Sequence, residues 1–102
     1  MVITTFQRNV YKLCSEVPKG KVTTYGEIAR ALNTKAYRAV GHALHCNPYA
    51  PQVPCHRVVS SDGTLGGFAY GAHAKVEILR KEGITVSENS VIDFETKLYK
   101  LS

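Results

Sequence analysis

Two helix-start signals, each followed by apolar residues at helical spacing, constrain the fold of this 102-residue chain most strongly. Thr4-x-x-Gln7 and Thr24-x-x-Glu27 both have the pattern of a capping box, in which two residues satisfy each other's backbone N–H groups. Pro18 and Gly20 end the first helix. The apolar positions that follow the two signals are Phe6, Val10, Leu13, Cys14 and Val17, then Ile28, Ala29, Ala31 and Leu32.

A third helix is predicted over residues 35–46, directly after the tight break Asn33-Thr34. Two short helices joined by a brief polar turn indicate a helix-turn-helix. On the third helix, Tyr37, Val40 and Leu44 are expected to face the core, with Arg38, His42 and His45 on the opposite side. Ala36, Ala39 and Ala43 form a strip of small side chains between these faces, which either allows close approach to DNA or reflects helix propensity alone.

The second half of the chain predicts shorter elements. The prolines of residues 47–54 predict a non-helical loop, and residues 57–59 predict a short strand. Residues 60–63 predict a turn, after which Thr64-Leu65 is expected to pair back as a small hairpin. Glycines bracket a loop over residues 66–71, and a last helix over 72–82 is expected to end at Gly83. We therefore predict a mainly α, winged-helix-like helix-turn-helix bundle with a short β-hairpin.

Length and composition predict one domain over residues 1–102, with a core at about 4–85 and a tail at 86–102 that wraps the domain. Three cysteines without a close pair argue against a disulfide framework and for a reducing compartment. With no apolar run for a signal peptide or membrane span, we expect a cytoplasmic location, associated with the nucleoid if the source is prokaryotic, and no membrane association. We also expect a monomer. The net charge of +5 fits a polyanionic partner, although a solvated basic surface would give the same value.

The tetrapeptide Pro54-Cys55-His56-Arg57 is the strongest functional signal. Nucleophilic chemistry requires a thiolate, and a neighbouring imidazole is a base that can generate one. The alternative is an inert, buried cysteine. A metal site is not expected, because the spacing of His42, His45, Cys46, Cys55 and His56 does not follow a compact Cys₂His₂ pattern. No cofactor is implied.

The sequence around this tetrapeptide resembles the 6-O-methylguanine-DNA methyltransferases. Residues 53–59, Val-Pro-Cys-His-Arg-Val-Val, look like the active-site signature of that family. Residues 20–29 resemble the entry into its DNA-binding motif. Further matches are Arg38-Ala39-Val40-Gly41, Asn47-Pro48, Gly63, Gly66-Gly67-Phe68, Lys75, Leu79 and Glu82-Gly83. The resemblance covers about residues 4–85 in the family's order and spacing.

This resemblance implies single-turnover transfer of an alkyl group from the O6 position of guanine in double-stranded DNA to Cys55. His56 would take the thiol proton through a bound water, and Glu82 would orient the imidazole. Asn47 would clamp the loop that carries the cysteine, and Tyr25 would help the guanine leave as a neutral base. Arg57 is interpreted as structural.

The alkylated carbon lies inside the base stack, so the nucleotide must be flipped out before the thiol reaches it. The resemblance assigns Arg38 as the wedge that fills the vacated stack, on a helix that enters the minor groove. It adds further candidate DNA contacts at Thr24, Ala36, Ala39, Gly41 and Ala43. The candidate pocket for the extruded base comprises Val58, Gly66, Phe68, Ala69 and Lys75.

Two departures from the family and two alternatives accompany this interpretation. Phe68 stands where relatives often have tyrosine, and Ala69 where some have serine. The resemblance does not extend to the N-terminal domain that many relatives carry, so the zinc found there in some is not implied. Its shortness resembles the alkyltransferase-like proteins, which bind alkylguanine without dealkylating it, but those carry tryptophan or alanine in place of Cys55. A helix-turn-helix regulator would leave the Cys55 motif unexplained.

Overall fold

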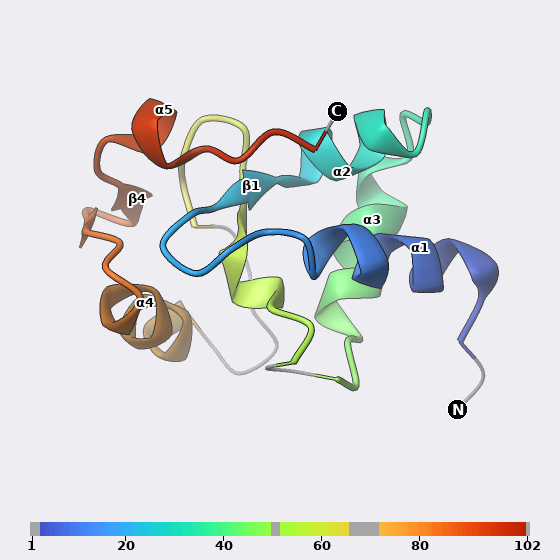
Figure 1. Cartoon of the computed structure of the whole chain (residues 1–102), viewed down its shortest axis with the longest axis horizontal. Coiled ribbons are helices and arrows are strands. Elements are labelled where there is room, and N and C mark those ends of the chain that lie inside the picture. The colour runs from blue at the N-terminus through green and yellow to red at the C-terminus, as the bar shows by residue number, and fades with distance from the viewer. Residues whose placement is uncertain (1–2, 50–51, 66–71, 102) are drawn as a thin grey trace.

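The computed structural model describes residues 3–49, 52–65 and 72–101. Five α-helices, one 3₁₀ helix and two small sheets make up the described fold, which is mainly α as predicted (Figure 1). In chain order the elements are α1 (Thr5–Cys14), β1 (Thr23–Thr24), α2 (Tyr25–Ala31), α3 (Tyr37–His45), η1 (Cys55–Arg57), β2 (Val58–Val59), α4 (Ala72–Lys81), β3 (Val86–Ser87), β4 (Ser90–Val91) and α5 (Phe94–Lys97).

The first two helices begin where the capping signals predict. The Thr4 side chain accepts a hydrogen bond from the Gln7 backbone N–H, and the Gln7 side chain accepts one from Thr4, so the first capping box is complete. Thr24 caps α2 by accepting from the Glu27 backbone. The Glu27 carboxylate does not return to Thr24; it binds Arg30 and the backbone of Leu101. The second signal is therefore half of a capping box.

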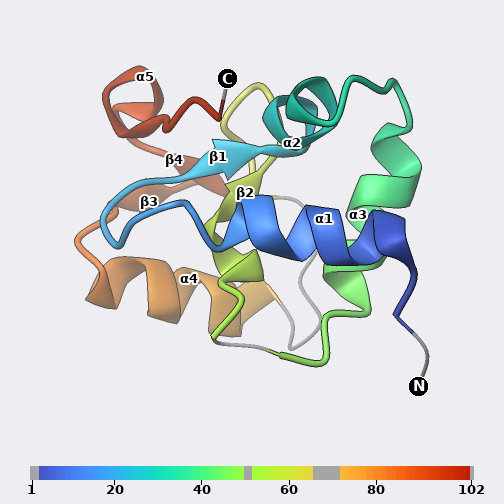
Figure 2. The ribbon, with the colours of Figure 1, turned by 45° about the vertical axis from the view of Figure 1, so that its right-hand side comes forward.

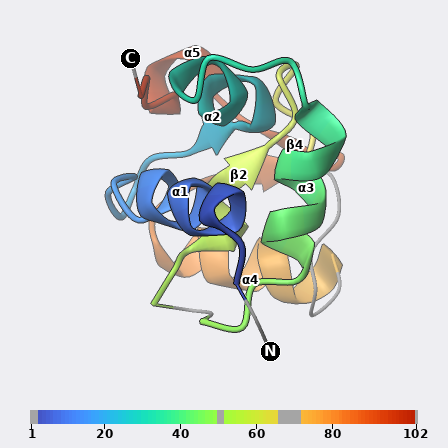
Figure 3. The same cartoon turned by 90° about the vertical axis from the view of Figure 1, so that its right-hand side faces the viewer.

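Helices α2 and α3 form the predicted helix-turn-helix, and α1 packs against both (Figure 3). Asn33 adopts the left-handed conformation, with φ of 58°, which ends α2 and redirects the chain. Val40, Ala43 and Leu44 of α3 are buried, as helical spacing predicts for Val40 and Leu44. The expectation that Tyr37 faces the core is wrong, because its side chain is 53% exposed. Tyr37 is the first residue of α3, and at this end the helix does not pack against the core.

The predicted strand at residues 57–59 exists, but its partner was not foreseen. β2 pairs in parallel with β1, with Thr23 opposite Val58 and Thr24 opposite Val59 (Figure 2). The turn at residues 60–63 is present, closed by a bond from the Ser60 N–H to the Thr64 carbonyl. Thr64 nevertheless pairs with Ser90 in the tail instead of extending a hairpin with β2. The β-hairpin of the described fold is β3–β4, inside the tail.

Helix α4 ends as predicted at Gly83, which has φ of 88°. The Gly83 N–H donates to the Arg80 carbonyl and the Ile84 N–H to the Leu79 carbonyl, which together form a Schellman motif. The tail then returns across the molecule. Val22 exchanges backbone hydrogen bonds with Lys97 and Tyr99, which places the tail beside β1.

Two apolar clusters form the core on either side of the β1–β2 pair. One lies among α1, α2 and α3 and includes Cys55 and Val58. The other joins Val22 and Val59 to α4 and to the tail residues Val86 and Val91. β2 therefore carries one core residue for each cluster and fixes the segment just before it, which contains Cys55. None of the helices in the described parts of the chain is long and apolar enough to cross a membrane.

Candidate active site and DNA interface

Cys55 and His56 lie on η1, a single turn of 3₁₀ helix between the proline-rich loop and β2. Pro54 precedes the turn, and the parallel pairing of β2 with β1 fixes its far end. Both side chains are largely buried, with exposures of 6% for Cys55 and 3% for His56. The dipeptide is thus held rigidly from both sides, which is what a reacting group needs for pre-organisation.

Glu82, at the C-terminal end of α4, lies beside both basic residues of η1. Its carboxylate accepts two hydrogen bonds from Arg57, of 2.9 Å at Oε1 and 2.6 Å at Oε2. Arg57 also donates to the Val17 carbonyl over 2.8 Å. Nε2 of His56 lies 3.1 Å from Glu82 Oε1. The Arg57 fork therefore holds the carboxylate in place against the imidazole.

The distance between His56 and Glu82 permits an ion pair, but the direction does not give an aligned hydrogen bond. Nε2 of His56 is buried and has no hydrogen-bond partner among the described residues. The two groups are therefore in electrostatic contact without an aligned hydrogen bond.

Burial lowers the pKa of His56, and the opposing influence of Glu82 does not cancel this effect. The imidazole is therefore neutral at pH 7 and able to accept a proton. Burial alone would raise the pKa of Glu82, but the hydrogen bonds from Arg57 and the proximity of His56 outweigh it and lower that pKa. The pair thus consists of a neutral base and an ionised carboxylate that can stabilise its protonated form.

Asn47 holds the loop that leads to Cys55. Its side-chain N–H donates to the Val53 carbonyl over 2.8 Å, and its side-chain oxygen accepts from the Tyr49 N–H over 2.9 Å. The Val53 N–H in turn donates to the Tyr49 carbonyl. One buried amide therefore closes the loop across six residues, the geometry that the sequence predicts for a clamp.

Tyr25 and Cys14 lie within electrostatic range of Cys55 in the core between α1 and α2. Burial raises the pKa of Tyr25, and a negative charge on Cys55 raises it further. Burial raises the pKa of Cys14 to about 12, so that thiol stays protonated at neutral pH. Both side chains therefore stay protonated at neutral pH.

Lys75 of α4 is fully buried. Its ammonium group donates to the carbonyls of Val58 and Leu65, at 2.7 Å from Val58. Burial lowers its pKa to about 8, and the nearby Cys55 opposes that shift. Lys75 thus joins β2 to the segment that enters residues 66–71. The other predicted pocket residues, Gly66, Phe68 and Ala69, lie outside the described residues.

The candidate DNA contacts divide into exposed and buried residues. Ala36, Arg38 and Ala39 are exposed on α3, and Gly41 is partly exposed. Ala43 is 1% exposed and packs in the core, so its predicted place in a surface strip is wrong. Helical spacing brings it onto the same face as Val40. Thr24 is also buried, where its hydroxyl caps α2.

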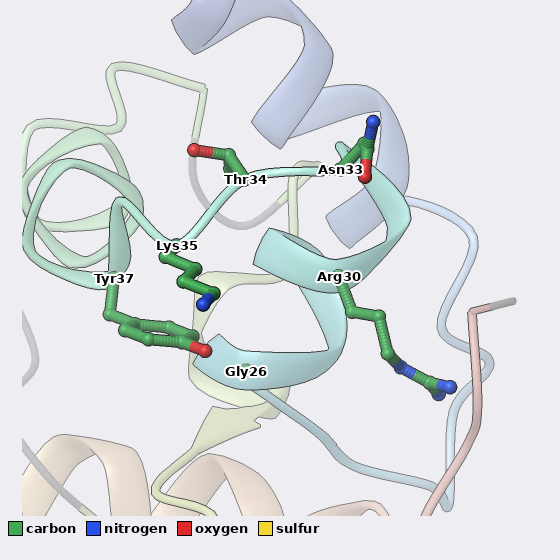
Figure 4. Close-up of a pocket in the computed structure, with 6 residues that line it drawn as sticks. All are labelled: Gly26, Arg30, Asn33, Thr34, Lys35 and Tyr37. Carbon is green, nitrogen blue, oxygen red and sulfur yellow. The ribbon is translucent and has the colours of Figure 1, made fainter.

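Two hollows share Gly26 of α2 and Tyr37 of α3. One, of about 380 Å³, is lined by Tyr25, Gly26, Tyr37, Ser60 and Ser61. The other, of about 360 Å³, is lined by Gly26, Arg30, Asn33, Thr34, Lys35 and Tyr37 (Figure 4). The sequence missed Tyr37 as a site residue, since its helical spacing suggested the core. Within the described residues, no group of three His, Cys, Asp or Glu side chains could hold a metal ion.

Comparison with known proteins identifies the family of this chain. The family model of the 6-O-methylguanine DNA methyltransferase DNA-binding domain matches residues 5–84. A methylated-DNA--protein-cysteine methyltransferase of Methanosarcina mazei is 50% identical over 80 residues, 78% of this chain and 51% of the relative. This chain therefore spans about half the length of the curated relatives it matches first.

Solved structures give the same result. An OGT of Mycobacterium tuberculosis in complex with DNA superposes with a TM-score of 0.76 at 42% identity, covering 78% of this chain and 49% of that one. Atl1 of S. pombe, crystallised with damaged DNA containing O6-carboxymethylguanine, superposes with a TM-score of 0.83 at 31% identity, covering 98% of this chain and 99% of Atl1. The chain belongs to the 6-O-methylguanine-DNA methyltransferase family, whose DNA-binding domain it contains.

Proposed function

We propose that this protein repairs double-stranded DNA by transferring an alkyl group from the O6 position of guanine to Cys55, once per molecule. The observation that carries the proposal is the buried Cys55-His56 pair with the Glu82 carboxylate 3.1 Å from the imidazole. Membership of the family supports it, as do the relatives that are named methylated-DNA--protein-cysteine methyltransferases.

The reaction is a displacement at the alkyl carbon. His56 takes the thiol proton, and the Cys55 sulfur forms a bond to the carbon as the bond between that carbon and O6 breaks. The electron pair of the broken bond stays on the guanine, and the Tyr25 hydroxyl donates its proton to neutralise that charge. The negative charge left on Tyr25 is balanced by the proton that His56 has taken from the thiol. Burial keeps both His56 and Tyr25 uncharged at the start, so each group is in the protonation state that its role requires.

Glu82 acts by stabilising the protonated imidazole. Arg57 holds the carboxylate with two hydrogen bonds, so Glu82 keeps its charge and its position when His56 becomes cationic. Asn47 keeps the preceding loop closed and so fixes the sulfur relative to the pocket. Once alkylated, Cys55 is a thioether, and no group in the described site can remove the alkyl group.

Arg38 is the wedge in this proposal. It projects from the exposed face of α3, and it makes no ion pair within the described part of the chain. A planar guanidinium can stack in place of the extruded base and donate to the orphan partner. The small exposed residues Ala36 and Ala39 allow the helix to approach the minor groove closely. The protein acts as a monomer in the reducing cytoplasm.

A second candidate is a binding module that marks alkylguanine for other repair proteins. It is favoured by the superposition with Atl1 over nearly the whole of both chains, tail included. The complete set of Cys55, His56, Asn47 and Glu82 favours chemistry instead. The two candidates differ in one property, since a binding module leaves the alkyl group on the DNA.

A duplex that carries a radiolabelled methyl group on O6 of one guanine tests this difference. We expect the label to move to the protein with wild type and Cys14→Ser, and to remain on the DNA with Cys55→Ser. The Cys55→Ser variant should still bind the damaged duplex, because recognition belongs to α3 and the pocket. Label that stays on the DNA with folded wild-type protein would establish the binding module.

A further inference from the structure

Tyr37 is an exposed aromatic side chain on the helix that otherwise presents small residues to solvent. It is 53% exposed, whereas its exposed neighbours on α3 include Ala36 and Ala39. Its ring extends from the start of α3 across to Gly26 at the start of α2, with the hydroxyl group near that glycine (Figure 4). An exposed tyrosine contributes little to the core, so stability does not explain its position.

The ring of Tyr37 separates the two hollows described above. Tyr37 and Gly26 line both of them, so the hollows are neighbours with the tyrosine as their shared wall. A Cβ atom built on Gly26 would have only the Thr24 hydroxyl within 4 Å, at 3.7 Å. Gly26 contributes no side chain, so Tyr37 is the one shared lining residue whose side chain stands between the hollows.

The two hollows differ in charge but share the chemistry of anion binding. One presents the cations Arg30 and Lys35 with the side chains of Asn33 and Thr34. Arg30 is paired with Glu27 at 2.7 Å, whereas Lys35 forms no ion pair among the described residues. The other hollow is lined by four residues that carry hydroxyl groups, Tyr25, Tyr37, Ser60 and Ser61. Hydroxyls and ammonium groups are common donors to DNA phosphate oxygens.

The hydroxyl-lined hollow is also connected to the reaction site. Tyr25 lines it, and the same tyrosine lies within electrostatic range of Cys55. Arg38 directly follows Tyr37 in the chain, so the proposed wedge is the neighbour of the residue that lines both hollows. A DNA strand that follows the two hollows would therefore pass from the cationic hollow, over Tyr37, to the entrance of the active site.

We propose that Tyr37 is a positioning residue that separates two phosphate subsites for the strand carrying the extruded nucleotide. One phosphate lies in the hollow with Lys35, and the next lies in the hollow with Tyr25, Ser60 and Ser61. The Tyr37 ring fits between them and holds the backbone in register, so that the extruded guanine reaches Cys55. This inference rests on the proposed function.

Loss of the Tyr37 ring should change the single-turnover rate much more than it changes the affinity for DNA. The total electrostatic attraction between the protein and the DNA phosphates depends on the charged side chains. The register of the DNA strand in the two subsites depends on the Tyr37 ring. Tyr37→Ala should therefore lower the single-turnover rate at saturating methylguanine duplex by about tenfold or more, since small misplacements of reactants are costly. Its Kd should change by less than about threefold. Tyr37→Phe keeps the ring and should recover most of the rate.

Wild-type protein, Tyr37→Ala and Tyr37→Phe are compared at saturating duplex, with circular dichroism to show that all are folded. A wild-type rate in Tyr37→Ala overturns the inference, as does a Tyr37→Phe variant as slow as Tyr37→Ala at unchanged affinity. Failure of the wild type to transfer methyl at all contradicts the proposed function instead. The two failures are therefore distinguishable.

Lys35 tests the phosphate subsites themselves. Lys35→Gln should reduce the slope of log affinity against log salt by about one, whereas the control Lys12→Gln on α1 should leave it unchanged. On a duplex with neutral methylphosphonates on either side of the lesion, Lys35→Gln should lose its effect, because the phosphate it contacts has no charge. The subsite assignment would be overturned if Lys35→Gln had the same effect on the native and the methylphosphonate duplex. Equal salt slopes for Lys35→Gln and Lys12→Gln would overturn it as well.

Discussion

The carboxylate of Glu82 determines the state of two neighbouring side chains at once. It neutralises the half-buried Arg57 through two hydrogen bonds, and it lies 3.1 Å from the imidazole of His56. Removing its charge therefore leaves Arg57 without its partner and His56 without stabilisation for its protonated form. A single substitution should lower both stability and rate, for these two separate reasons.

Glu82→Gln should slow methyl transfer by at least about tenfold, less than loss of a general base itself, because the protonated imidazole loses the carboxylate that stabilises it. It should also lower the free energy of unfolding by roughly 1–3 kcal/mol, because a hydrogen-bonded charge loses its partner. Glu77→Gln is the matched control, since Glu77 lies on the same helix but is half-exposed and 4.0 Å from Arg80. Single-turnover assays and urea unfolding measure the two effects. Equal behaviour of both variants would remove Glu82 from the mechanism.

Arg38→Ala should reduce the single-turnover rate at saturating duplex much more than it reduces affinity, because a wedge acts on extrusion of the base. A simple phosphate contact would instead lower the salt slope by about one and leave the saturating rate unchanged. Measuring affinity at several salt concentrations beside the rate separates these outcomes. An unchanged saturating rate would show that another residue extrudes the base.

Lys75 should make stability depend on pH in a specific window. Its pKa falls from 10.5 to about 8 on burial, so between these values the unfolded chain holds a proton that the folded protein does not. The free energy of unfolding of wild type, relative to Lys75→Met, should therefore rise from pH 8 to pH 10.5, by up to about 3 kcal/mol. Below pH 8 the difference should be constant. Urea unfolding at several pH values tests this, and a difference independent of pH would contradict it.

At the scale of elements, two glycines with the same backbone conformation offer a matched comparison. Gly63 and Gly83 both have φ of 88°. A Cβ atom at Gly83 would have no atom within 4 Å, whereas one at Gly63 would lie 3.1 Å from the Phe94 ring. Gly83→Ala should cost about 1–2 kcal/mol from backbone strain alone, and Gly63→Ala should cost more. Thermal unfolding of both variants compares them, and equal losses would mean that Phe94 moves aside freely.

The helices could be predicted because their signals are local. Thr4 and Thr24 cap helices within three residues of themselves, and Gly83 ends α4 through its own conformation. The strand pairing could not be predicted in this way. Thr23 of β1 pairs with Val58 of β2, which lies 35 residues later in the chain. Neither two-residue strand carries a sequence signal that identifies its partner. Residues 58–59 therefore suggested a local hairpin, while the tail supplied the hairpin instead.

At the scale of the whole molecule, the tail is part of the core. Val91 lies in β4 and is buried with Val22 and Leu79, whereas its neighbour Ile92 is 41% exposed. Val91→Ala should therefore lower the free energy of unfolding by about 1–3 kcal/mol, and Ile92→Ala by less than about 0.5 kcal/mol. Urea unfolding of the pair tests this. Similar small losses in both would show that the tail does not contribute to the folded core.

The candidate site could be predicted where its residues belong to a recognisable sequence motif. The segment around Cys55 and His56 identified the reacting groups, and Asn47 and Glu82 followed from the family's spacing. Tyr37 and Ala43 were misplaced because helical spacing gives the relative faces of α3 but not the point where it leaves the core. The bond between Arg57 and Glu82 joins residues 25 positions apart, and only the packing of α4 against η1 reveals it.

The central claim is that Cys55 accepts the alkyl group and keeps it. Intact mass spectrometry of the protein after incubation with excess methylguanine duplex tests this directly, followed by peptide mapping of the modified residue. The account predicts one added methyl group per molecule, located on Cys55, with no further turnover. An unchanged mass in folded protein bound to the duplex, or a methyl group on Cys14 or Cys46, would contradict it.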